Sequence, residues 1–268
     1  MLQISEFEQV TQIRMCRQIE GSSPYWVAAY LVDGLLIDAG CSYTSKELTA
    51  FLAGKKLRTV INTHYHEDHI GANDDLMKAF GVEVYAHPDA IPLIAKRHEL
   101  HPYQELLFGY PVPTRVSPVP TELKTDHFTF RMLDTPGHCR GHICPMELSK
   151  GWCFTGDLFA RTDPKIIREE ENLGEVIDSM RKIIEAGGER LVLFTGVGKI
   201  VEDGKKALRD CIGYLTDFSQ RAKEMKSQGL GVDDIVTRLF GAEHSFARLT
   251  NGQVTTFNLV QSLLETVS

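Results

Sequence analysis

The chain has 268 residues, of which 43% are hydrophobic and 24% charged, a composition typical of a globular protein with a substantial core. Its formal net charge of −7 argues against nucleic acid or an anionic membrane as a partner. No run approaches the ~18 apolar residues of a membrane span, and residues 1–8 lack the apolar core of a secretory signal. We therefore expect a cytoplasmic protein with no membrane contact. The six cysteines form no CxxC pair, so reduced thiols are expected.

Strand-like and helical patterns alternate in the first half of the chain. Strands are expected at residues 9–17, 26–32, 35–38, 57–62 and 82–86. Helices are expected at residues 44–52, 73–80 and 88–93. Asp33-Gly34 predicts a hairpin turn between the second and third strands. Asn73 is expected to cap the second helix and Gly81 to end it.

The second half begins irregular and ends helical. Prolines and aromatics alternate over residues 98–120, which predicts an irregular loop that forms a lid or pocket wall. Strands are expected at 128–133, 143–148, 152–155 and 191–194, and a helix at 174–186. Helices at 204–226, 232–240 and 254–265 follow, without any strand pattern. We therefore predict a core at residues 1–202 and a helical C-terminal appendage at residues 203–268.

The run Thr63-His64-Tyr65-His66-Glu67-Asp68-His69 concentrates three imidazoles and two carboxylates directly after a predicted strand. His64 and His66 are two residues apart, so in extended backbone their side chains project to the same side. First-row divalent metals favour such nitrogen and oxygen ligands, and catalytic sites commonly combine three protein ligands with water. The run predicts a site for one or two divalent ions, with zinc expected and iron or manganese as alternatives.

Further polar residues follow later strands in the same way. His138 comes after the strand at 128–133, Asp157 after 152–155, and Gly196-Val197-Gly198 after 191–194. Loops gathered on one rim of a sheet would form a site on a rigid scaffold.

These motifs resemble those of the metallo-β-lactamase superfamily. The resemblance lies in His64-Tyr65-His66-Glu67-Asp68-His69, Thr135-Pro136-Gly137-His138, Thr155-Gly156-Asp157, and the early strand Leu35-Leu36-Ile37-Asp38-Ala39-Gly40. It spans residues ~25 to ~200 in this motif-based comparison. It implies an α+β protein with an αββα sandwich, in which two sheets lie face to face between helices and the metal site lies at one edge.

The resemblance also implies a role for each motif residue. His64, His66 and His138 would hold the first metal, Asp157 would bridge two metals, and Asp68 and His69 would belong to the second. The family usually completes the second site with a histidine between two glycines, where this chain has Val197, which offers no lone pair.

Three alternatives follow for the second site. A metal is held more weakly by Asp68, His69 and Asp157 with added water. Alternatively, only the three-histidine site is filled and Asp68 handles protons, or the site no longer turns over substrate. In a working enzyme, metal-activated water attacks the substrate while Asp68, the predicted catalytic residue, donates a proton to the leaving group.

We therefore expect a metal-dependent hydrolase of a small ester, thioester or lactone, with that small molecule as its partner. One alternative is an iron oxygenase similar to the superfamily's persulfide dioxygenases, and another is a non-catalytic ligand-binding relative. The sequence does not decide the oligomeric state, for which a homodimer is one option.

Overall fold

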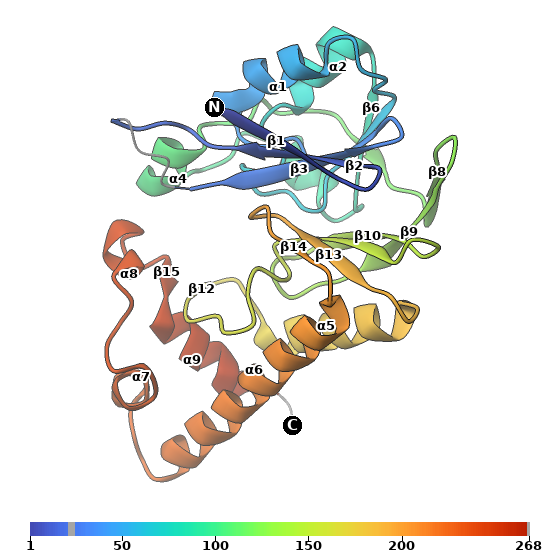
Figure 1. Ribbon diagram of the computed structural model, residues 1–268. Helices are drawn as coiled ribbons and strands as arrows, with labels where there is room; N and C mark the ends of the chain where they lie inside the picture. The colour runs from blue at the N-terminus through green and yellow to red at the C-terminus, as the bar shows by residue number, and fades with distance from the viewer. Residues whose placement is uncertain (21–24, 267–268) are drawn as a thin grey trace.

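Two β-sheets lie face to face in the computed structural model, which describes residues 1–20 and 25–266 (Figure 1). The first sheet has seven strands, in the order β1 (Leu2–Phe7), β2 (Val10–Met15), β3 (Val27–Val32), β4 (Leu35–Ile37), β5 (Thr59–Ile61), β6 (Glu83–Ala86) and β7 (Ser117–Pro118). Its strands pair antiparallel from β1 to β4 and parallel from β4 to β7.

The second sheet has six strands, in the order β14 (Ile200–Val201), β13 (Val192–Thr195), β11 (Trp152–Gly156), β10 (Ile143–Glu147), β9 (Thr129–Asp134) and β8 (Glu122–Lys124). Its strands pair antiparallel except β11 and β13, which are parallel. The inner faces of the two sheets bury a shared apolar cluster that includes Tyr30, Phe130, Trp152, Phe154 and Phe194. This cluster explains why the sheets stack, because burial of large aromatic side chains is a strong driving force for packing.

Helices cover the outer faces of both sheets, which confirms the αββα sandwich (Figure 1). The first sheet packs against α1 (Ser45–Leu52), α2 (Asn73–Phe80) and α4 (Pro102–Leu107). The second packs against α5 (Leu173–Ala186), α6 (Gly204–Ser227) and α9 (Thr256–Glu265). The remaining short elements are η1 (Ser42–Thr44), α3 (Ile91–Ile94), α7 (Val232–Phe240) and α8 (Phe246–Leu249). Within the described residues, no helix is both long and apolar enough to cross a bilayer.

The C-terminal helices share a core with the second sheet. Leu208 and Leu215 of α6 and Leu259 of α9 lie in one apolar cluster with Met146 and Leu193. A two-stranded sheet of β12 (Ile167–Arg168) and β15 (Val254–Thr255) adds a further link. The boundary at residues 202/203 stays a prediction, but the appendage is packed onto the core.

The predicted hairpin turn is present. Asp33 and Gly34 have φ angles of 48° and 84°, and β3 pairs with β4 on either side of them. All six cysteines lie among the described residues and are buried and unpaired, as expected.

Several sequence predictions were wrong in detail. Asn73 does not cap α2, because Ala72 precedes the helix and the Asn73 amide instead exchanges hydrogen bonds with Asn62. Residues 98–120 are not wholly irregular, since they contain α4 and β7. The C-terminal part is not strand-free, because Val254–Thr255 form β15 where a helix was expected to begin. The short or edge strands β1, β8, β12 and β14 were not expected either.

Candidate metal centre

The six predicted site residues meet at one edge of the sandwich. Parallel strands end on the same side of a sheet, and the site loops follow β5, β11 and β13, while His138 lies in the connection from β9 to β10. All six side chains are buried or nearly so, with Asp157 the most accessible at 16%. The sequence prediction that these residues converge is therefore matched by the geometry.

The first group consists of His64, His66 and His138, whose possible ligand atoms all lie within 4.8 Å of one another. His66 Nδ1 and His138 Nε2 are 3.0 Å apart. His64 Nε2 is buried and has no hydrogen-bond partner among the described residues. Three imidazoles converging in this way form a donor set that suits a first-row divalent metal.

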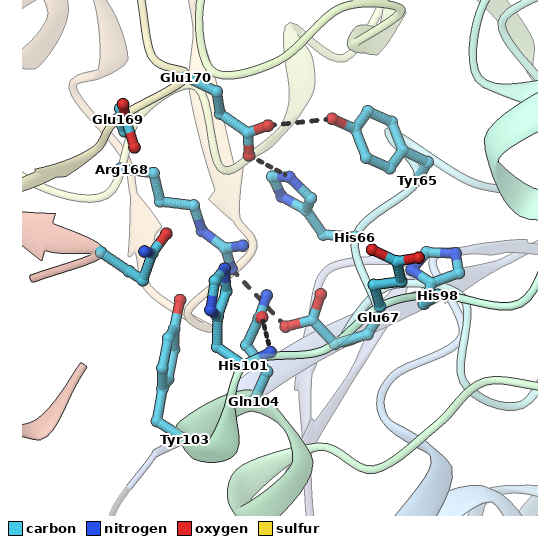
Figure 2. Close-up of a pocket in the computed structure, with 12 residues that line it drawn as sticks. Tyr65, His66, Glu67, His98, His101, Tyr103, Gln104, Arg168, Glu169 and Glu170 are labelled. Carbon is cyan, nitrogen blue, oxygen red and sulfur yellow. Dashed lines mark hydrogen bonds and ion pairs between the residues drawn. The ribbon is translucent and has the colours of Figure 1, made fainter. Parts of the chain in front are cut away.

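Two glutamates from one loop contact the outer nitrogens of two of these histidines. Glu170 Oε1 lies 2.9 Å from His66 Nε2, and its other oxygen accepts a hydrogen bond from the Tyr65 hydroxyl at 3.2 Å (Figure 2). Glu171 Oε2 lies 3.2 Å from His138 Nδ1, within ion-pair distance but without hydrogen-bond alignment. Carboxylates in such positions orient metal-binding imidazoles and raise their basicity.

The second group consists of His64, His69 and Asp157. Asp157 lies between the two groups, with Oδ1 3.5 Å from His69 Nε2 and Oδ2 3.9 Å from His138 Nε2. Asp68 Oδ2 lies 3.7 Å from His69 Nε2. Asp157 thus has one oxygen toward His69 and the other toward His138, and its role as a bridging ligand stays a prediction.

Asp38 contacts the backbone and one imidazole of the His-rich loop. It accepts hydrogen bonds from Thr63 N at 2.7 Å and from Thr63 Oγ1, and it lies 2.8 Å from His69 Nδ1. Thr63 Oγ1 in turn lies 3.0 Å from His64 Nδ1. Asp38 is 2% exposed and has a φ of 63°, so this orienting carboxylate is held in uncommon backbone geometry.

Burial and neighbouring charge shift the proton affinities of the cluster. Burial raises the pKa of Asp68 to about 6; the Glu67 carboxylate adds to this, and His69 opposes it. Burial holds the pKa of His64 well below its usual range. Burial would also lower the pKa of His69, but the Asp38 carboxylate and its neighbours raise it well above that range. His64 is therefore neutral at physiological pH, the form in which imidazole binds metal.

The donor atoms of both groups fit a bound divalent ion. His64 Nε2, His69 Nε2 and Asp68 Oδ1 are buried without a hydrogen-bond partner in the described part of the chain. Buried polar atoms are normally satisfied, so three unpartnered donor atoms in one place point to a ligand. An ion held by these atoms would provide their missing contacts.

The glycine loop after β13 packs directly against the second group. Gly196 N donates to Gly156 O at 2.7 Å, and a Cβ atom at Gly196 would lie 2.1 Å from Asp157 Oδ1 and 2.9 Å from His69 Cε1. Only glycine fits this approach. The next residue, Val197, lines a cavity that also borders Asp157, so an apolar side chain occupies the position where the family resemblance implies a histidine.

Glu67 of the His-rich loop is buried beside Arg168. It is 1% exposed, and its Oε1 lies 3.8 Å from Arg168 Nη2 (Figure 2). Arg168 belongs to β12, which pairs with Val254 of β15. Burial would lower the pKa of Arg168, but the carboxylate of Glu67 and its neighbours raise it above its usual range, so Arg168 stays charged.

Sequence reasoning assigned no role to four residues at the centre, namely Asp38, Arg168, Glu170 and Glu171. Asp38 lies in a quoted family motif, and its place before Ala39-Gly40 was the available signal. The Arg168 to Glu171 run is charged and has no local pattern that marks it, so only its position in space reveals its contacts with His66, His138 and Glu67.

The chain is similar in sequence to two proteins that are named as hydrolases. The chain is 37% identical over 108 residues to hydroxyacylglutathione hydrolase GloC of Haemophilus influenzae, covering 38% of this chain and 50% of that protein. It is 26% identical over 191 residues to the atrochrysone carboxyl ACP thioesterase of Aspergillus fumigatus, covering 69% of this chain and 53% of that protein. The chain thus spans about half the length of these two relatives.

A solved metallo-beta-lactamase family protein from Thermus thermophilus shares the fold. The two structures superpose with a TM-score of 0.64 at 16% sequence identity, and the match covers 94% of this chain and 90% of that one. The sequence model described as "Metallo-beta-lactamase superfamily" matches residues 27–196, well over half of the chain. With the αββα fold and the ordered histidine and aspartate loops described above, this match shows that the chain belongs to the metallo-beta-lactamase superfamily.

Proposed function

We propose that this protein is a metal-dependent hydrolase of a small thioester, ester or lactone, and that zinc is its metal. The observation that supports this most strongly is the convergence of His64, His66 and His138 beside Asp157. The similarity to proteins named as a hydroxyacylglutathione hydrolase and an ACP thioesterase favours acyl substrates.

The proposed ligand sets follow the two groups. His64, His66 and His138 would hold the first ion, and Asp157 would be shared with a second position formed by Asp68 and His69. When bound, a divalent ion would lower the pKa of its water to ~7 and polarise the substrate carbonyl. Because Val197 supplies no ligand, the second position binds metal more weakly than the first.

Asp68 is proposed to carry the proton in the reaction. In hydrolysis of a thioester, the water oxygen bonds to the acyl carbon, the carbon–sulfur bond breaks, and a proton from water reaches the leaving sulfur. When the second position holds no ion, Asp68 is buried with an unpartnered oxygen and a pKa raised by burial to about 6, which suits exchange of a proton near neutral pH. Asp38, Glu170 and Glu171 orient the imidazoles.

Metal analysis together with turnover tests this proposal. Purified protein should contain zinc, at one equivalent or more, and should hydrolyse members of a thioester, ester and lactone panel. His66→Ala should lower both zinc content and turnover by about 100-fold or more, whereas the exposed His127→Ala should change neither.

Two outcomes would replace the proposal with an alternative. Iron as the bound metal, with oxygen uptake on thiol persulfides, would indicate an oxygenase. Substoichiometric metal and ligand-dependent melting without turnover on any substrate would indicate a binding protein. Both alternatives are retained because Val197 presents an apolar group at a position where a metal ligand is usual.

A further inference from the structure

An apolar cavity of about 400 Å³ opens next to the metal centre, and we call it the acyl cavity. His138, Asp157 and Val197 border it at the end nearest the centre. Most of the remaining wall is apolar and includes Leu107, Phe108, Phe159, Leu173, Leu215 and Phe246. A cavity of this size is typical of small-molecule sites, and its lining favours an apolar ligand.

The charged groups on the acyl cavity are either paired or exposed. Asp157 and Glu171 face histidines of the centre. Arg161 is paired with Asp163 at 2.8 Å, and Arg168 lies 3.8 Å from Glu67. Lys165 and His244 also line the cavity, and their side chains are exposed. Few polar groups are therefore left for a buried part of a ligand, and burying a polar group there without a partner would be unfavourable.

A second cavity of about 340 Å³ also borders the centre, and we call it the polar cavity because its lining residues are polar or charged. Its lining includes Glu99, His101, Gln104, Glu169, Glu170 and Gln253, together with His66 (Figure 2). The two cavities share Tyr103 and Arg168 in their walls. Because His66 borders one cavity and His138 the other, with their nitrogens 3.0 Å apart, both cavities reach the metal centre.

The two cavities differ in the character of their lining, and each has exposed as well as buried residues. Glu99, His101 and Glu169 of the polar cavity are exposed. Leu173 and Leu215 of the acyl cavity are 2% and 1% exposed, whereas Lys165 and His244 on its wall are exposed. The polar lining suits a polar leaving group, and the apolar wall suits the part of the substrate without hydrogen-bonding groups.

We propose that the substrate is a thioester or ester with an apolar acyl chain, which occupies the acyl cavity while a polar leaving group faces the polar cavity. This inference rests on the proposed hydrolase function and names its substrate class. Leu215 of α6 and Phe246 of α8 lie beyond residue 196, where the family match ends, so part of the wall comes from this chain's own C-terminal helices.

A chain-length series tests the inference on the metal-loaded full chain. Acyl thioesters of one polar thiol, from acetyl to decanoyl, are compared by kcat/KM. Each methylene that enters the cavity should raise kcat/KM about threefold to fourfold, so hexanoyl should exceed butanoyl by about tenfold. The rise should stop once the cavity is full.

Two matched variants locate the effect. Phe246→Ala widens the acyl cavity and should move the optimum toward longer chains. Phe257→Ala removes the same ring from a partly buried site in the C-terminal region that does not line the cavity, and it should leave the optimum in place. An equal shift in both variants, or in neither, would overturn the assignment of the wall.

A binding measurement separates failure of the inference from failure of the proposed function. Titration of the metal-loaded protein with hexanoate and acetate compares two carboxylates with the same metal-binding group, so their affinity ratio reports the cavity. A ratio of about 15-fold is expected from four added methylenes if about half of the gain per methylene is realised. Equal affinities, or equal turnover of short and long thioesters, would refute the inference while leaving hydrolysis intact. Absence of any hydrolysis would refute the proposed function, and the affinity ratio would then report only whether the acyl cavity binds an apolar chain.

Discussion

Replacing Asp38 by asparagine should weaken metal binding without removing any proposed ligand. The carboxylate lies 2.8 Å from His69 Nδ1 and accepts hydrogen bonds from the backbone and hydroxyl of Thr63. Asparagine keeps the shape and one acceptor oxygen. Its NH₂ group replaces an oxygen that accepts from Thr63 or faces His69, so a donor there meets a donor. The negative charge next to the His69 imidazole is also lost.

The structure sets the size of the effect. Hydrogen bonds to a charged group contribute about 1.5–3 kcal/mol each, and Asp38 is 2% exposed, so solvent does not replace them. Loss of the His69 contact and mismatch at one Thr63 contact should lower the free energy of unfolding by about 3 kcal/mol. Loss of a carboxylate that orients a ligand typically lowers metal affinity 10- to 100-fold, and we expect this for the ion next to His69.

The assay is metal competition against a chromophoric chelator, with urea unfolding measured in parallel. Asp33→Asn is the matched control, because Asp33 also has a positive φ, of 48°, and also accepts a backbone hydrogen bond at 2.7 Å, but far from the centre. Asp33→Asn should change stability modestly and metal affinity not at all. If the two variants bind metal equally well, Asp38 does not orient the site, and the reasoning is wrong.

Three further predictions concern the loops. Gly196→Ala should lower metal affinity, because its Cβ would lie 2.1 Å from Asp157 Oδ1. Gly213→Ala, in open space within α6, should instead stabilise the fold by about 0.5–1 kcal/mol. Chelator competition measures metal affinity and urea unfolding measures stability in both variants. Burial would raise the pKa of Asp33, but hydrogen bonds outweigh it and lower the pKa to about 2. The ionised Asp33 contributes about 1 kcal/mol to the free energy of unfolding after solvent screening, and this contribution is present above pH ~4 and lost as pH falls toward ~2. The difference in the free energy of unfolding between the wild type and Asp33→Asn should therefore shrink over that range. Val197→His should raise the affinity for a second ion in metal titration, and an unchanged stoichiometry and affinity would contradict the proposed second position.

The elements that were predictable from sequence carry a local signal. Asp33-Gly34 needs positive φ at both positions, and this requirement identifies the turn without knowledge of the rest of the fold. The helix at 174–186 has a periodic apolar face that α5 buries. By contrast, β1 has no fully buried residue, so it shows no alternation, and it lies at the sheet edge, where it pairs with β2 and packs only Leu2 and Phe7 against the apolar clusters.

Elements that depend on long-range pairing were not predictable. Ile167–Arg168 and Val254–Thr255 are each two residues long, and neither has a strand pattern of its own. They become strands because they meet across more than 80 residues of sequence. The same holds for α4, whose N-terminal Pro102 suits a first helical turn but was one of several prolines in an irregular-looking segment. Contacts at the centre made by Glu170 and Arg168 depend on this long-range placement.

The valine at position 197 links the metal centre to the acyl cavity. Its neighbour Gly196 lies against Asp157 and His69, so the loop backbone comes as close to the second group as a loop that carries a ligand would need to. The side chain at 197 borders the cavity together with Phe246 and Leu215. An imidazole there would add a ligand to the second group and a polar edge to the apolar wall, whereas the isopropyl group removes the ligand and extends the wall. The chain-length series with Val197→His therefore joins the two proposals: if both hold, tighter binding of the second ion should be accompanied by a weaker preference for long acyl chains.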